Sequence, residues 1–255
     1  MSAMGASFLL NQLCDVESDL KNKKLFLLSE NHITKKEAKI ETAILIILSF
    51  LLAAWVNISV LITVIGFVFI TGYIYNYKPF AYKDKPLGSL VANALMGWLA
   101  FAIGWLTVNQ LGWGVVIESA PYLFFNTALY FFTTLPDIPG DKASNKATLA
   151  VLHGKDFVIY LALACFVLSL ATAFLLNDNF ALLFIGLSIP FFILTAAKKD
   201  VITTIKTTKY TLLFFAVAIC IKIPFYFVLI ISIFAFTKWY FKNRFNYDYP
   251  NFKGA

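Results

Sequence analysis

Long apolar runs separated by short polar segments dominate this chain. A run such as ETAILIILSFLLAAWV, which begins at Glu41, shows none of the alternation of a half-buried strand. A helix needs about 20 apolar residues to cross a hydrocarbon core of roughly 30 Å. An apolar block at 210–241 is too long for one span and is divided at Lys222 and Pro224. The pattern predicts eight transmembrane helices, at residues 41–57, 58–77, 87–108, 114–135, 157–176, 180–197, 208–221 and 224–241.

These segments predict an all-α fold, a polytopic integral membrane helical bundle. Only helices and closed barrels satisfy their backbone hydrogen bonds in lipid, and a barrel would need alternating strands of about ten residues. No linker-like stretch interrupts the sequence, so we expect residues 1–255 to form a single membrane-embedded domain. The weakly apolar start, MSAMGASFLLNQLCD, is too short for a span, and we interpret it as the second half of a partial N-terminal transmembrane helix.

Composition and charge agree with a membrane protein. The chain is 60% hydrophobic and 14% charged, whereas a soluble domain is about one-quarter charged. The net charge of +7 could indicate a nucleic-acid partner, but 20 of the 21 Lys and Arg residues lie in or beside loops on one side of the predicted bundle. Cationic loops stay cytoplasmic. We therefore expect no nucleic-acid partner. We place the C-terminus on the cytoplasmic face of the cell's inner (plasma) membrane. The cationic loops on the same face are 15–40, 78–86, 136–156, 198–207 and 242–255.

Two acidic pairs stand at the cytoplasmic ends of apolar segments. In NQLCDVESDLKNKK, Asn11, Asp15 and Asp19 recur every four residues, and in LPDIPGDKASNK the pair is Asp137 and Asp141. Residues four apart share one face of a helix, so each pair can present its carboxylates side by side. The Pro-Gly dipeptide inside the second pair predicts that its helix ends or kinks there.

The acidic pairs suggest a magnesium–diphosphate site. Carboxylate pairs that face one another repel unless a cation lies between them, and Mg²⁺ takes oxygen ligands from one or two carboxylates together with substrate phosphates. The metal would make the diphosphate a better leaving group. Lys142, directly after Asp141, could bind the remaining oxygens as a point charge. The alternative is that these residues are solvated loop acids with neighbouring lysines.

A third polar stretch, YIYNYKPFAYKDKPLGSLVANAL, lies on the same predicted face. Tyr75, Lys78, Lys83 and Lys85 could present hydroxyl and ammonium donors to phosphate. The alternative is a cationic loop with aromatic anchors at the membrane interface.

Together, the three stretches resemble motifs of the UbiA superfamily of membrane-embedded prenyltransferases. They occur in the family's order, and the resemblance covers essentially the whole chain. Ala81 stands where the family usually has Arg, and Asn145 where it often has Gly. The matches are N-x-x-x-D-x-x-x-D through Asn11, Asp15 and Asp19; Y-x-x-K-P-x-R-x-K through Tyr75, Lys78, Pro79 and Lys83; and D-x-x-G-D-K-x-x-x-K-x-T through Asp137, Gly140, Asp141, Lys142, Lys146 and Thr148.

The resemblance implies an all-helical ring around a cavity, with polar caps on the cytoplasmic side. It implies that an isoprenyl diphosphate is ionised at its allylic C–O bond and that the carbocation alkylates an aromatic or lipid acceptor in the membrane. The resemblance assigns the catalytic and Mg²⁺-binding roles to four carboxylates, Asp15, Asp19, Asp137 and Asp141, and diphosphate binding to Asn11, Tyr75, Lys83 and Lys142.

Two other functions stay open from the sequence. The family has a helix before that of the first motif, and its absence here suggests either a truncated gene model or a truncated, catalytically inactive member that binds isoprenoids or protein partners.

A transporter would carry charges near mid-bilayer at broken helices. Here the acids lie at helix ends on one face, and only Glu118 lies toward the other side, which disfavours transport. The acceptor and the prenyl chain length stay open.

Overall fold

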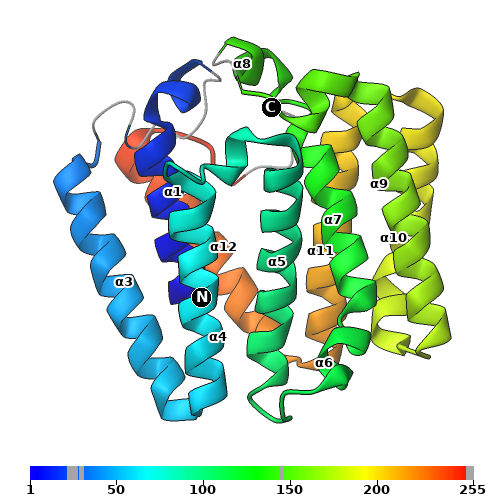
Figure 1. Cartoon of the computed structure of the whole chain (residues 1–255), viewed down its shortest axis with the longest axis horizontal. Coiled ribbons are helices and arrows are strands. Elements are labelled where there is room, and N and C mark those ends of the chain that lie inside the picture. Colours follow the sequence, from blue (N-terminus) through cyan, green and yellow to red (C-terminus); the bar gives the residue numbers. More distant parts are fainter. Residues whose placement is uncertain (22–27, 29–31, 144–145, 251–255) are drawn as a thin grey trace. The chain divides into compact units, whose positions relative to one another are not determined.

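The computed structural model describes residues 1–21, 28, 32–143 and 146–250, with the side chains of 17–21 excepted. The described residues contain helices and no strand. Figure 1 shows the helices, which are α1 (Ser2–Lys21), α3 (Lys35–Val56), α4 (Ile58–Val68), η1 (Phe69–Ile74), η2 (Tyr82–Asp84), α5 (Pro86–Trp105), α6 (Trp113–Glu118), α7 (Ala120–Thr134), α8 (Ile138–Ala143), α9 (Leu149–Leu175), α10 (Asn179–Lys198), α11 (Val201–Lys222) and α12 (Phe225–Phe245).

The prediction of an all-α membrane protein is confirmed. Each of the eight predicted segments coincides with one helix or with two consecutive helices. Among the described residues, six helices are long and apolar enough to cross a membrane, namely α3, α5, α9, α10, α11 and α12, and the apolar helix Ile58–Ile74 is shorter. The weakly apolar start of the chain lies in the 20-residue helix α1.

The chain divides into two compact units, Met1–Ser169 and Leu170–Ala255. All three polar motifs lie in the first unit. The single domain over 1–255 stays a prediction.

Capping side chains determine where helices of the first unit begin. Thr34 and Glu37 form a capping box at the start of α3, in which each side chain accepts a hydrogen bond from the other residue's backbone N–H. Asn57 caps α4 by accepting from the Val60 N–H at 2.8 Å, and its amide donates to the Leu106 carbonyl at 2.8 Å. This second bond joins the start of α4 to the end of α5.

The helix that precedes the third polar stretch changes its winding near its end. After Val68 it continues as the six-residue π-helix η1. A turn at Ala81, with φ 39°, then leads into the short 3₁₀ helix η2. Pro86 stands in the first turn of α5, where its fixed φ suits a helix start. The segment between Asn76 and Asp84 is thereby held between two packed helices.

The helix break near the second acidic pair lies earlier than predicted. α7 ends at Thr134, before Asp137, and the Pro-Gly dipeptide lies inside the short helix α8. Thr148 of the same motif accepts a hydrogen bond from the Val151 N–H at 3.4 Å, as a residue at a helix start does. α9 is interrupted at Gly154, whose φ of 82° and ψ of 173° lie outside helical values.

In the second unit the break between α11 and α12 falls at Lys222 and Pro224 as predicted, but the predicted loop 198–207 is wrong. α11 begins at Val201, because Asp200 caps it by accepting from the Thr203 N–H at 2.7 Å. The Thr203 hydroxyl and N–H lower the pKa of the Asp200 carboxyl. Threonines that looked loop-like in the sequence are buried between α10 and α11, where the Thr195 and Thr207 hydroxyls lie 2.7 Å apart.

Candidate active site

Three segments distant in sequence meet at one polar cluster in the first unit. They are the C-terminal half of α1, the turn that contains η2, and the chain from α8 to Thr148 (Figure 1). One backbone hydrogen bond joins the last two segments: the Ala147 N–H donates to the Asp84 carbonyl at 3.3 Å. Within the last segment, the Lys146 N–H donates to the Asp141 carbonyl at 2.9 Å. The motifs predicted to cooperate are therefore adjacent.

Asp15 is the carboxylate at the centre of this cluster. The Lys83 ammonium donates to Asp15 Oδ1 at 2.7 Å, and the Lys146 ammonium reaches the same oxygen at 3.5 Å. The side chain of Lys83 is only 8% exposed. Two cations on one carboxylate oxygen join all three segments, because Asp15, Lys83 and Lys146 each come from a different one.

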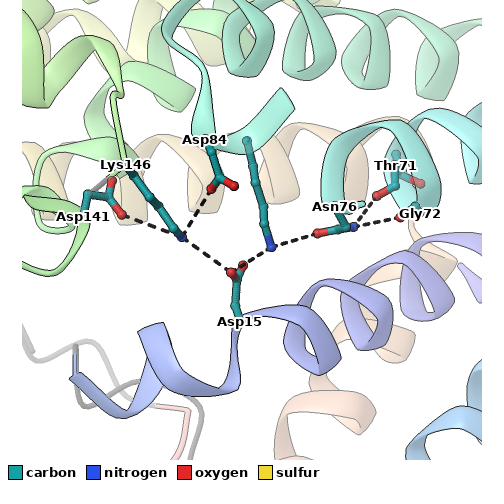
Figure 2. Close-up of polar contacts among 8 residues, drawn as sticks. Asp15, Thr71, Gly72, Asn76, Asp84, Asp141 and Lys146 are labelled. Atoms are coloured by element: carbon teal, nitrogen blue, oxygen red, sulfur yellow. Dashed lines mark hydrogen bonds and ion pairs between the residues drawn. The ribbon is translucent and has the colours of Figure 1, made fainter. Parts of the chain in front are cut away.

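Lys146 lies among three carboxylates, as Figure 2 shows. Besides Asp15, its ammonium is 3.9 Å from Asp84 Oδ1 and 3.9 Å from Asp141 Oδ1. Asp141 is buried. A cation between carboxylates reduces their mutual repulsion, so Lys146 helps these three acids to lie together.

Asn76 is the neutral member of the cluster. Its Oδ1 accepts from the Lys83 ammonium at 3.3 Å, and its Nδ2 donates to the Thr71 carbonyl at 2.8 Å and the Gly72 carbonyl at 3.1 Å. Both carbonyls belong to η1. The lysine that contacts Asp15 is thereby connected to the π-helix.

Tyr75 lies just beyond the apolar helix Ile58–Ile74 and beside the cluster. The phenol of a tyrosine is protonated at neutral pH, so the Tyr75 hydroxyl can donate a hydrogen bond.

The sequence model of the UbiA prenyltransferase family matches residues 1–201, which include every member of this cluster. The chain belongs to the UbiA prenyltransferase family.

Similar proteins agree with the family assignment. The digeranylgeranylglyceryl phosphate synthase of Methanobrevibacter smithii is 28% identical, over 82% of this chain and 77% of that protein. A solved structure concerned with digeranylgeranylglyceryl phosphate synthase in membranes is 25% identical, with a TM-score of 0.58 over 84% of this chain and 77% of that one. A UbiA homologue from Archaeoglobus fulgidus, solved with GPP and Mg²⁺, is 20% identical and shares the fold with a TM-score of 0.68, over 86% of this chain and 83% of that one. The chain is a multi-pass membrane protein of this family.

Several residues predicted from the UbiA motifs fall in or beside the cluster. Asp15, Lys83 and Asp141 contact its other members directly. Asp137 lies one turn before Asp141, whose N–H donates to the Asp137 carbonyl at 2.9 Å. Asn11 precedes Asp15 by about one turn of α1.

The structure does not place the side chains of two other predicted residues, Asp19 and Lys142, in the cluster. The backbone of Asp19 belongs to α1, but its side chain lies outside the described residues. Lys142 is exposed, and it is Lys146, four residues later, whose ammonium lies among the carboxylates. Their roles at the diphosphate stay predictions.

Sequence reasoning assigned no role to Asn76 or Asp84, and it did not single out Lys146 among the lysines near the second acidic pair, although all three belong to the cluster. Lys146 was part of the matched motif, and Asp84 stands beside Lys83 in Lys-Asp-Lys. Acid and base alternation of that kind is also typical of solvated loops. Asn76 carries no charge, and only its contacts with η1 and Lys83 reveal it.

The side chains of the cluster suit Mg²⁺, the metal that the family resemblance implies. Asp15, Asp84 and Asp141 supply carboxylates, and Asn11 Oδ1 is a buried oxygen with no hydrogen-bond partner in the part of the chain described. Hard oxygen donors are what Mg²⁺ prefers. Among the described residues, no three His, Cys, Asp or Glu side chains are already grouped closely enough to hold a metal ion. The Lys146 ammonium lies between the three carboxylates, so a metal would have to replace it there.

Proposed function

We propose that this protein transfers an isoprenyl group from a prenyl diphosphate to a glyceryl phosphate lipid in the membrane. The observation that carries the proposal is the cluster in which Lys83 and Lys146 meet Asp15, Asp84 and Asp141. Membership of the UbiA family supports the same reaction class.

The charged side chains have separate tasks in this proposal. Lys83 and Lys146 bind diphosphate oxygens as point charges, and Tyr75, Asn11 and Lys142 complete the diphosphate site. Mg²⁺ is held by four carboxylates, those of Asp15, Asp19, Asp137 and Asp141. When bound, the metal neutralises the diphosphate and improves it as a leaving group. The solved UbiA homologue with GPP and Mg²⁺ supports this pairing of ligands.

The reaction separates charge, and the cluster would stabilise it. The allylic C–O bond of the donor breaks with its electron pair staying on the diphosphate. An acceptor hydroxyl oxygen then forms a bond to the allylic carbon, and its proton passes to the released diphosphate. In this proposal the lysines lie where negative charge develops, and such preorganised charge contributes most to lowering a barrier.

The acceptor is proposed from the relatives. Both the Methanobrevibacter smithii protein and one solved neighbour carry the name digeranylgeranylglyceryl phosphate synthase. A glyceryl phosphate lipid is therefore our first choice, and an aromatic acceptor is the second. The cation-rich loops beside the cluster support placing the site on the cytoplasmic face.

Membranes that contain the full chain can test the donor and acceptor together. Labelled prenyl diphosphates of increasing length are incubated with MgCl₂ or EDTA and with geranylgeranylglyceryl phosphate, 4-hydroxybenzoate or homogentisate. We expect magnesium-dependent diphosphate release and a labelled lipid with the first acceptor, and neither product from a variant that carries both Asp15→Asn and Asp141→Asn. Labelled aromatic product would overturn the acceptor. Prenyl diphosphate binding without diphosphate release under any condition would overturn the transfer reaction and favour an isoprenoid-binding protein.

A further inference from the structure

We propose that Asn76 is the positioning residue for Lys83, and that the π-helical turn η1 holds the Asn76 amide in the one orientation that serves this role. The inference rests on the proposed function, in which Lys83 binds the diphosphate. It adds a residue that neither the family motifs nor the charge pattern identifies.

The neighbours of Asn76 determine how its amide is oriented. On one side are two backbone carbonyls, those of Thr71 and Gly72, at 2.8 and 3.1 Å from Nδ2. On the other side is the Lys83 ammonium, 3.3 Å from Oδ1. Carbonyls only accept and an ammonium only donates. The reverse orientation would place the amide oxygen against the two carbonyls and the amide NH₂ against the ammonium, and none of these pairs could form a hydrogen bond. Asn76 is 7% exposed, and water cannot easily replace these bonds.

The π-helix creates the need for this amide. The Tyr75 N–H donates to the Ile70 carbonyl five residues before it, whereas the Tyr77 N–H donates to the Tyr73 carbonyl four residues before it. Between these two bonds, the carbonyls of Thr71 and Gly72 share a single backbone N–H, that of Asn76. A buried carbonyl without a donor is costly. The Asn76 side chain supplies the missing donors, and the change of winding thus fixes the side chain.

The neutral oxygen of Asn76 suits a lysine that must bind an anion. Asp15 and Asn76 are the two partners of Lys83 among the described residues. Asp15 attracts the ammonium by charge, while Asn76 orients it without neutralising it. The substitution Asn76→Asp would remove the N–H groups that bond to the η1 carbonyls and would add a negative charge where a diphosphate has to bind. We therefore expect Asn76 to affect the binding of the prenyl diphosphate through Lys83.

A double-mutant cycle on donor binding separates this role from a merely structural one. The ligand is geranylgeranyl S-thiolodiphosphate, an unreactive analogue, with MgCl₂ and the full chain in nanodiscs, so the result does not depend on the acceptor. Asn76→Ser is the main variant, because a serine hydroxyl can still donate to the carbonyl four residues earlier but is too short to reach Lys83. We expect Asn76→Ser to raise the Kd about tenfold in the wild-type background and less than twofold when Lys83→Met is also present.

Asn57→Ala is the matched control. Asn57 is a half-buried asparagine whose amide, like that of Asn76, donates to a carbonyl, but it lies at the opposite end of the same helix. Its loss should lower the unfolding temperature and leave the Kd unchanged in either background. Asn76→Asp should weaken binding more than Asn76→Ser.

The outcomes distinguish a failure of the role inferred for Asn76 from a failure of the proposed prenyl diphosphate substrate. If the effects of Asn76→Ser and Lys83→Met on Kd multiply, or if Asn76→Ser binds like the wild type, Asn76 does not act through Lys83 and the inference is wrong. If the wild-type protein fails to bind the analogue at all, the proposed donor is wrong as well.

Discussion

Replacing Lys146 with methionine tests whether this lysine is the cation that keeps the carboxylates together. The change keeps most of the side-chain length and removes the charge. The ammonium lies 3.5 Å from Asp15 and 3.9 Å from both Asp84 and Asp141. At an effective dielectric constant of about 20, one such pair attracts by about 4 kcal/mol, so the gross attraction is roughly 12 kcal/mol.

The net effect on stability will be much smaller. Desolvation of the charges and the repulsion between the carboxylates offset most of the attraction, and removing one partner of a fully buried ion pair costs about 3–5 kcal/mol. Lys146 is 17% exposed and Asp84 is 39% exposed, and solvent therefore screens part of the interaction. We expect Lys146→Met to destabilise the protein by about 2–3 kcal/mol, just below that range.

Magnesium should compensate for the lost charge. Unfolding of the full chain in detergent is followed by tryptophan fluorescence, with and without millimolar MgCl₂. Because Lys146 would no longer compete for the carboxylates, the variant should unfold at a lower temperature without magnesium and gain more from its addition than the wild type does.

The control for this experiment is Lys142→Met, an exposed lysine four residues earlier. We expect it to unfold like the wild type, with the same response to magnesium. If the two methionine variants behaved alike in both conditions, Lys146 would not be the cation that stabilises this cluster, and our account of its charge balance would be wrong.

Three further predictions concern catalysis and sidedness. Asp15→Asn and Asp141→Asn should each lower turnover at least a hundredfold, about 3 kcal/mol of barrier, without loss of folding, and near-normal turnover in either would contradict a metal–diphosphate role. Lys83→Ala should lower kcat/KM for the prenyl diphosphate about tenfold, whereas Lys85→Ala should be nearly neutral, because Lys85 is exposed and its recorded contacts are with the Pro79 carbonyl at 3.5 Å and the Tyr82 ring at 5.6 Å; equal losses would mean that the loop acts through bulk charge. A cysteine at Lys242, in a variant without the native cysteines, should react with an impermeant maleimide only after cells are opened, and labelling of intact cells would reverse the proposed topology.

Much of the fold could be predicted because a bilayer allows few solutions. Apolar runs long enough to span predicted the helices, and Pro224 marked the break between α11 and α12. The error at 198–207 has a physical cause. Threonine is common in loops, but its hydroxyl can bond to the helix backbone and to a neighbouring helix, as Thr207 does with Thr195.

The site was only partly predictable for a different reason. Spacing along one helix indicates that Asp15 can present a carboxylate to one face, but it does not indicate which lysine reaches that carboxylate from another segment. Lys142 and Lys146 are both basic residues after the second acidic pair, and only the structure reveals that Lys146 is the one that reaches Asp15. The role inferred for Asn76 depends on a local change from α to π winding, for which the apolar sequence of η1 gives no signal.

The balance of charge explains why lysines, rather than further carboxylates, complete this cluster. Lys83 and Lys146 neutralise two of the three charges on Asp15, Asp84 and Asp141. A prenyl diphosphate adds several negative charges, which these acids alone would repel. If Mg²⁺ binds the carboxylates in place of the lysines, both ammonium groups become available to the diphosphate without leaving the cluster. Lys83 would then depend on Asn76 for its position, because Asp15 would no longer hold it alone. A neutral acceptor that is hydrogen-bonded to the π-helical turn would thus allow the same lysine to stabilise the acids and to bind the substrate.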